Sequence, residues 1–118
     1  MITQLTPADF DAWLASQDGA AHPPMVLDVR EPWEIQTASV TPEGFTLRQI
    51  AMADIPARLA QLQQELPADQ PLACLCHHGM RSLQVANYLM QNGFTQVLNI
   101  HGGIHAWSQQ RDPAVPQY

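Results

Sequence analysis

Short apolar runs that alternate with segments of helical periodicity constrain the fold of this chain most. Strand-length runs occur at MVLDV (25–29), PLACLC (71–76) and QVLNI (96–100), and a weaker one at FTLRQIA (45–51). Continuous apolar strands are typical of parallel sheets covered on both faces, and a helix between successive strands supplies the crossover. The sequence therefore predicts a three-layer α/β fold with four or five strands.

Helical signals fill the intervals between these runs. Thr6 is expected to cap the first helix, with Pro7 at its first position. The clearest pattern places leucines at 59, 62 and 66, and another helix is expected to end at Asn92–Gly93. The expected helices lie in TPADFDAWLASQ (6–17), EPWEIQT (31–37), IPARLAQLQQEL (55–66), RSLQVANYLMQNG (81–93) and GGIHAWSQQ (102–110).

Length and charge exclude several classes of protein. With 118 residues the chain fits one domain, expected over residues 1–108. Two prolines predict an extended tail over residues 109–118. A formal net charge of −6, without any lysine, argues against nucleic acid as a partner. The sequence shows neither a membrane-spanning run nor a secretory signal, so a cytoplasmic location is expected.

The stretch CHHGMRS (76–82) lies where an apolar run gives way to a helix. In open parallel sheets, sites form at the carboxyl ends of strands, where the chain enters the next helix. A helix N-terminus and a nearby cation favour the thiolate form of a cysteine, and Cys76 is expected to have both. Gly79 permits a turn in which amides converge, and Arg81 adds positive charge. We therefore expect an anion cradle beside a nucleophilic Cys76.

Cys74 is expected to be a core residue, because unpaired cysteines are among the most buried residue types. In a strand it would lie roughly 6.5 Å along the chain from Cys76. This spacing is at the limit of disulfide geometry. A structural disulfide is therefore not expected, and a redox sensor in which Cys74 resolves an oxidised Cys76 would be strained.

Histidines near the loop raise the question of a metal, because His77, His78, His101 and His105 are of a type that binds zinc. Adjacent histidines are expected to project in different directions, and no closed set of four ligands is visible. No metal and no other cofactor is therefore predicted, and His77 and His78 are assigned to the rim of the pocket. A cysteine–histidine–asparagine protease arrangement has little support, since neither histidine has an acidic partner in sequence.

A charge cluster follows the first apolar run. It contains Asp28, Arg30, Glu31 and Glu34. A structural role, in which an acidic side chain pairs with Arg30 and fixes the loops, is favoured over direct catalysis. The glycine pair in NIHGGIHAW (99–107) fits either a phosphate-binding turn or the entry into a helix.

Together these segments resemble the single-domain rhodanese family of sulfurtransferases. The likeness rests on LDVREPWEI (27–35), CHHGMRS and NGFTQVLNIHGGIHAW (92–107), in this order, with MADIPARL (52–59) between them. It covers most of residues 2–108, and the ending DPAVPQY also looks like that of some bacterial members. The resemblance implies a central parallel five-stranded sheet flanked by helices.

The resemblance also implies a reaction. The thiolate of Cys76 would attack the sulfane sulfur of a donor, with thiosulfate as the usual assay substrate, and a persulfide would remain on the cysteine. An acceptor such as cyanide or a thiol would then remove the sulfur, and the donor or acceptor could also be a protein. Asp28 and Arg30 would support the site. By similarity, the sulfur would be bound by the backbone N–H groups of the loop, those of His77, His78, Gly79, Met80, Arg81 and Ser82.

Loop length and two departures refine this expectation. Cys76 through Arg81 spans six residues, as in sulfur-handling members, whereas the related phosphatase branch uses a longer loop. The stretch ASVTPEGFTLRQI (38–50) replaces a GHIPGA-like segment of many members. The loop HHGMR also lacks the hydroxyl-bearing residues of some thiosulfate-preferring members. An alternative function is therefore a persulfide carrier or binding module that serves a dedicated protein partner.

Overall fold

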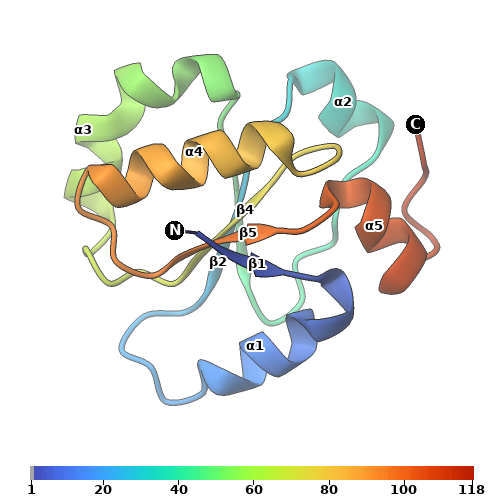
Figure 1. Cartoon of the computed structure of the whole chain (residues 1–118), viewed down its shortest axis with the longest axis horizontal. Coiled ribbons are helices and arrows are strands. Elements are labelled where there is room, and N and C mark those ends of the chain that lie inside the picture. The colour runs from blue at the N-terminus through green and yellow to red at the C-terminus, as the bar shows by residue number, and fades with distance from the viewer. Residues whose placement is uncertain (1) are drawn as a thin grey trace.

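The computed structural model describes residues 2–118 and contains one sheet with helices on both of its faces (Figure 1). All strand pairs are parallel, and the order across the sheet is β1-β5-β4-β2-β3. The predicted three-layer α/β fold with a five-stranded sheet is confirmed. The strands are β1 (Thr3–Leu5), β2 (Met25–Asp28), β3 (Thr46–Gln49), β4 (Leu72–Leu75) and β5 (Val97–Ile100).

Five helices occupy the segments in which the sequence predicted them. Short 3₁₀ turns at Pro7–Asp9 and Met52–Asp54 precede two of them. The Thr6 hydroxyl accepts a hydrogen bond from the Asp9 amide at 3.3 Å, which confirms the predicted cap. The helices are α1 (Phe10–Ser16), α2 (Pro32–Thr37), α3 (Ile55–Glu65), α4 (Met80–Gln91) and α5 (Gly103–Gln110).

The core lies on both faces of the sheet, which explains the continuous apolar runs. Along β2, Val26 faces a cluster that holds Phe10 of α1 and Trp107 of α5. Its neighbour Leu27 faces the opposite cluster, which holds Leu62 of α3 and residues of α4. Because side chains alternate along a strand, a strand with helices on both faces needs apolar residues at successive positions.

The register of the sheet brings three loops to one edge. Asp28 at the end of β2 pairs with Leu75 at the end of β4, and Cys74 pairs with Asn99 of β5. The chain turns into α2, α4 and α5 just beyond these strand ends. The loops that follow β2, β4 and β5 therefore lie together at the carboxyl edge of the sheet.

Strand β1 was not predicted as a separate element. It has only three residues, Thr3–Leu5, and pairs along one side with β5 at the edge of the sheet. Two of its three side chains are exposed, so it lacks the continuous apolar pattern that marks the central strands.

The end of the chain returns to the carboxyl edge of the sheet. Helix α5 includes residues 109 and 110, the first two of the segment expected to be extended. After it, Val115 is buried, and its carbonyl accepts a hydrogen bond from the Ser108 hydroxyl at 2.6 Å. The C-terminus lies near α2 and α5 (Figure 1).

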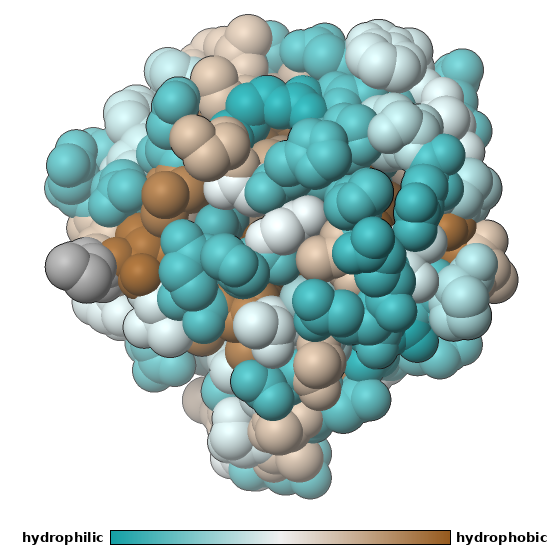
Figure 2. Space-filling view, turned by 45° about the vertical axis from the view of Figure 1, so that its right-hand side comes forward, coloured by the Kyte–Doolittle hydropathy of each residue, from teal (hydrophilic) through white to brown (hydrophobic). Residues whose placement is uncertain are grey.

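The surface is mainly polar on the face that contains the C-terminal segment. Figure 2 shows hydrophilic residues over most of this face, with smaller groups of hydrophobic residues between them. Within residues 2–118, no helix combines the length and the apolar character needed to cross a bilayer.

Candidate active site

Cys76 lies directly beyond β4, at the start of the loop that leads into α4. Its side chain is 1% exposed. The Gly79 amide donates to its Sγ at 3.0 Å, and the Ser82 hydroxyl lies 3.2 Å from the same atom. Gly79 adopts φ 97°, a left-handed conformation that favours glycine and that turns the chain into α4. The loop thus folds back on the sulfur of its own first residue.

Asn99 of β5 organises the inner side of this loop. Its Oδ1 lies 2.6 Å from the Ser82 hydroxyl, and its Nδ2 donates to the Gly79 carbonyl at 3.0 Å. A hydroxyl has one proton, so Ser82 serves either Asn99 or the sulfur of Cys76 as donor at any moment. When the sulfur carries a negative charge, a hydrogen bond from the Ser82 hydroxyl to Sγ is favoured, since hydrogen bonds to ionised acceptors are stronger.

The first turn of α5 holds the outer side of the loop. The Ile104 amide donates to the Cys76 carbonyl at 2.8 Å, and the His105 amide donates to the His77 carbonyl at 3.1 Å. Because N–H and C=O point in opposite directions across a trans peptide, the amides of His77 and His78 point away from α5. A Cβ on Gly103 would lie 2.3 Å from the His77 carbonyl oxygen. The glycine pair therefore permits close approach of two backbones.

Arg81 is bound to Glu34 of α2. Its Nη1 and Nη2 each donate to one carboxylate oxygen of Glu34, both at 2.7 Å. Hydrogen bonds from Arg81 hold the pKa of the buried Glu34 carboxyl at about 2, well below its ordinary value of 4.5, and the Glu31 amide adds to this effect. The positive charge predicted for the cradle is thus matched by a carboxylate of the protein.

A second buried ion pair lies beside the first. Arg30 binds the Asp28 carboxylate through Nε at 2.9 Å and Nη2 at 2.6 Å, and both side chains are fully buried. The predicted pairing of an acidic residue with Arg30 is confirmed in its geometry. Arg30 also donates to the Tyr118 hydroxyl at 3.2 Å, and this hydroxyl donates to Glu34 at 2.9 Å. The C-terminal residue therefore connects both ion pairs.

Aromatic rings are stacked over the loop. The Tyr118 ring lies parallel to that of His77, with centroids 3.8 Å apart, and the His77 and His78 rings stack at 3.9 Å. The expectation that the adjacent histidines diverge is wrong, because the loop curves toward Gly79 and does not continue as an extended strand. His105 lies next to this stack. Burial, followed by the charge of His78, lowers the pKa of His77.

Cys74 belongs to the core and not to the site. It is fully buried in β4, and burial raises the pKa of its thiol to about 12. Both cysteines are free thiols. Since a thiolate is the reactive form of cysteine, this burial disfavours Cys74 as a nucleophile or as a resolving residue at neutral pH.

The predicted residues of the loop occupy different positions around the sulfur. Gly79 and Ser82 contact it directly, whereas the Met80 side chain is 71% exposed and leaves only its backbone near the turn. Asn99 and Tyr118 were not predicted as residues of the site. Asn99 is the one polar residue in VLNI (97–100), which was a signal for it, but nothing in the sequence linked residue 118 to the loop.

The fold and the site together define a parallel α/β domain with a cysteine at the N-terminal turn of a helix. The sequence profile of the family described as rhodanese-like domain matches residues 6–110. The chain therefore belongs to the rhodanese-like domain family.

Two curated relatives have different overall lengths. A sulfurtransferase of Allochromatium vinosum is 37% identical over 91 residues, which cover 77% of this chain and 78% of that protein. The chloroplastic rhodanese-like/PpiC domain-containing protein 12 of Arabidopsis thaliana is 40% identical over 79% of this chain. The match spans only 30% of that plant protein.

Solved structures agree with this assignment. A rhodanese-related protein of Thermoplasma volcanium has a TM-score of 0.70 at 27% identity, covering 98% of this chain and 99% of that one. The human single-domain sulfurtransferase TSTD1 has a TM-score of 0.72 over 94% of this chain and 99% of its own. At 18% identity, the human protein supports the fold alone.

Proposed function

We propose that the protein is a sulfurtransferase that carries a sulfane sulfur as a persulfide on Cys76. The single observation that supports this most is the position of Sγ, which accepts a hydrogen bond from the Gly79 amide at 3.0 Å and lies at the N-terminal turn of α4. Amides at a helix N-terminus stabilise negative charge, whether on a thiolate or on the terminal sulfur of a persulfide.

The proposed reaction has two steps. The Cys76 thiolate attacks the outer sulfur of thiosulfate, a sulfur–sulfur bond forms, and sulfite leaves with the electron pair of the broken bond. An acceptor such as cyanide then attacks the terminal sulfur and leaves as thiocyanate, which regenerates the thiolate. This is nucleophilic catalysis with a covalent intermediate.

The charge balance of the site favours sulfur over phosphate as the transferred group. Arg81 is paired with Glu34, and Arg30 is paired with Asp28. The hydrogen-bond donors that remain around the Cys76 sulfur are therefore backbone amides and one hydroxyl, and these suit a singly charged sulfur. A phosphoryl group carries more charge over several oxygens, and its binding favours an unmatched guanidinium.

The experiment is mass spectrometry of the intact protein after incubation with thiosulfate, together with an assay of thiocyanate formation. We expect a gain of one sulfur atom on wild type and on Cys74→Ala. Cys76→Ala should gain none and form no thiocyanate above the uncatalysed rate. An unmodified wild type under these conditions would disprove thiosulfate as donor, and repeating the measurement with polysulfide tests the reaction class.

Transfer to or from a protein partner is the second candidate function, and one observation favours it. Among residues 2–118, the exposed large hydrophobic side chains are Trp33 and Met80, at 62% and 71%. Met80 directly follows Gly79 in the loop, and the Trp33 ring contacts that of Tyr118 edge-on. Exposed apolar groups at the rim of a site suit a protein surface better than a small anion.

This second candidate is tested by comparing two acceptors of the persulfide. Reduced thioredoxin serves as a protein dithiol and dithiothreitol as a small one, at equal thiol concentration. If protein transfer is favoured, thioredoxin discharges the persulfide faster, and Trp33→Ser slows this reaction without changing the rate with dithiothreitol. Equal rates with both acceptors would leave the small-molecule enzyme as the better description.

A further inference from the structure

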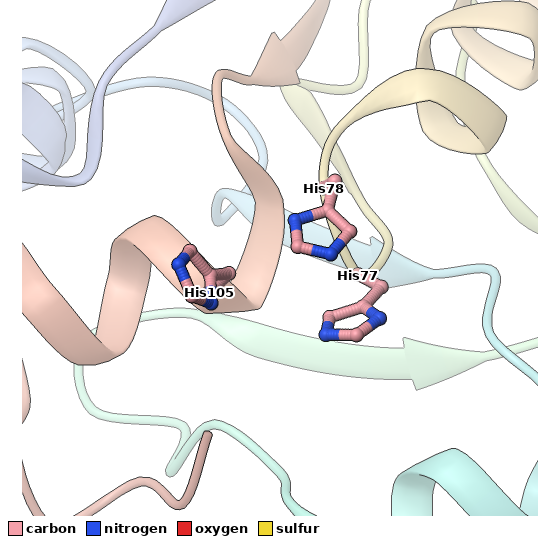
Figure 3. A group of neighbouring side chains, drawn as sticks. All are labelled: His77, His78 and His105. Carbon is pink, nitrogen blue, oxygen red and sulfur yellow. The ribbon is translucent and has the colours of Figure 1, made fainter. Parts of the chain in front are cut away.

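Three histidine side chains lie close together where the loop before α4 meets α5 (Figure 3). His77 and His78 come from the loop before α4, and His105 comes from the first turn of α5. One ring nitrogen of each lies within 4.8 Å of the others. We propose that His77, His78 and His105 form a binding site for a divalent transition-metal ion such as Zn²⁺.

The backbone that presents two of these ligands is already fixed. The His105 amide donates to the His77 carbonyl at 3.1 Å, and the neighbouring Ile104 amide donates to the Cys76 carbonyl at 2.8 Å. These bonds hold the loop against α5 before any ion arrives. A metal site assembled on a fixed backbone loses less conformational entropy on binding than one formed by mobile segments.

Two of the ring nitrogens lack another role. Within the part of the chain that the structure describes, His77 Nε2 and His105 Nδ1 are buried and have no hydrogen-bond partner. A buried polar atom without a partner is unfavourable, and each such atom in a folded protein calls for an explanation. Coordination of an ion would satisfy both nitrogens at once, since an unprotonated imidazole nitrogen is a good ligand for zinc.

The three histidine side chains must rearrange slightly to bind one ion together. Zinc–nitrogen bonds near 2.1 Å in a tetrahedron place the ligand atoms about 3.4 Å apart. An ion also lies in the plane of each ring that binds it, so the stacked rings of His77 and His78 must turn relative to each other. The exposed side chain of His78 has room to do so, whereas His77 is covered by Tyr118.

The sulfur of Cys76 is not a member of this group of mutually close ligand atoms. The ion would therefore have three protein ligands and keep a position for water, which is the pattern of open zinc sites. It would tie the loop to α5 through side chains, in addition to the backbone bonds. This inference concerns metal binding and does not depend on the proposed sulfur transfer.

The test is titration of the metal-free, untagged protein with Zn²⁺ by isothermal calorimetry, repeated with Co²⁺ by visible absorption. Both are done in a Cys76→Ser background, so that the thiolate cannot act as a ligand. We expect one equivalent of ion to bind. His105→Gln and, separately, His78→Gln should each weaken the binding at least tenfold.

His22→Gln is the matched control, because His22 lies outside the group and pairs with Asp69 at 3.4 Å. It should leave the affinity unchanged, and circular dichroism confirms that each variant is folded. The exposed position of His78 makes His78→Gln the decisive variant if His105→Gln does not fold. Absence of binding, or binding that survives the folded variants of the group, overturns the proposal.

Discussion

Arg81 and Glu34 form a bidentate ion pair that joins α4 to α2, with both nitrogen–oxygen distances at 2.7 Å. The Glu34 carboxylate is buried, and it also receives hydrogen bonds from the Glu31 amide and the Tyr118 hydroxyl. The guanidinium at the end of the loop is therefore held by the protein itself. We infer that Arg81 is a positioning residue for the start of α4.

The first prediction concerns the stability of this pair. Arg81→Met leaves a buried carboxylate without its cation, and it should lower the free energy of unfolding by about 3 kcal/mol. Glu34→Gln should cost less, and the double variant should be more stable than the sum of the single effects implies. Urea unfolding of the four proteins measures this coupling.

Arg48→Met provides the control for this cycle, because Arg48 pairs with the more exposed Glu65 on α3. Surface pairs contribute little to stability because solvent screens them, so the loss should be small. Additive effects of Arg81→Met and Glu34→Gln would contradict a coupled pair.

The second prediction concerns acid stability. The pKa of Glu34 is about 2 in the folded protein and returns to its ordinary value of 4.5 when the chain unfolds. The stabilisation is thus complete above pH 4.5 and is lost as the pH falls toward 2. With screening at the partly exposed Arg81, we expect a loss of about 2–3 kcal/mol from this group over that range.

Unfolding by urea at pH 6, 4 and 3 checks the acid effect. Glu34→Gln should show a smaller decrease in the free energy of unfolding than wild type between these values, because glutamine does not titrate. Parallel pH profiles for both proteins would show that Glu34 does not carry the effect.

The third prediction concerns the C-terminal tyrosine. Tyr118→Phe keeps the ring that stacks on His77 but removes the hydroxyl that bonds to Arg30 and Glu34. It should cost about 1–2 kcal/mol of stability, as expected for hydrogen bonds to charged groups. Tyr118→Ala removes the stacking as well and should raise the KM for thiosulfate more than it changes kcat.

Tyr88→Phe on α4 is the control for Tyr118, since it removes a hydroxyl from a partly buried tyrosine that packs against the core. Its effect on stability should be smaller than that of Tyr118→Phe. Equal effects of both substitutions would show that the hydrogen bonds of the Tyr118 hydroxyl to Arg30 and Glu34 contribute nothing specific to stability.

The fold could be predicted because its determinants are local. Runs such as MVL (25–27) in β2 and LACL (72–75) in β4 are apolar at every position only when both faces of a strand are covered. The position of Cys76 beside the start of a helix could be predicted for the same reason, because Cys76, Gly79 and the start of α4 are neighbours in sequence. Strand β1 was not predicted, because its three residues lie at the edge of the sheet and show no clear apolar pattern.

The side chains that bind the loop could not be predicted, because they are distant from it in sequence. Glu34 is 47 residues from Arg81, and Tyr118 is 84 residues from Glu34. Many acidic residues could have matched Arg81, and local periodicity does not choose among them. Only the parallel register, which brings the ends of β2, β4 and β5 together, decides which charges meet.

The fourth prediction concerns the hydroxyl beside the sulfur. Ser82→Ala removes a donor that lies 3.2 Å from Sγ of Cys76 and leaves Asn99 Oδ1 without its partner. The rate of persulfide formation in a single turnover should fall by about tenfold or more, since such donors stabilise developing charge. Ser16→Ala on α1 should have no effect. An unchanged rate in Ser82→Ala would assign the stabilisation to the backbone amides alone.

The fifth prediction separates close backbone contact from backbone strain. Gly103 and Gly93 both have positive φ, 62° and 101°, so alanine at either position costs about 1 kcal/mol of conformational strain. An added Cβ at Gly93 meets no atom within 4 Å, whereas at Gly103 it would overlap the carbonyl oxygens of His77 and Cys76. Gly103→Ala should therefore cost roughly 2 kcal/mol more than Gly93→Ala and should also slow persulfide formation, because the loop must move away from α5. If both variants lose the same stability and keep the wild-type rate, the contact between α5 and the loop does not set the geometry of Cys76.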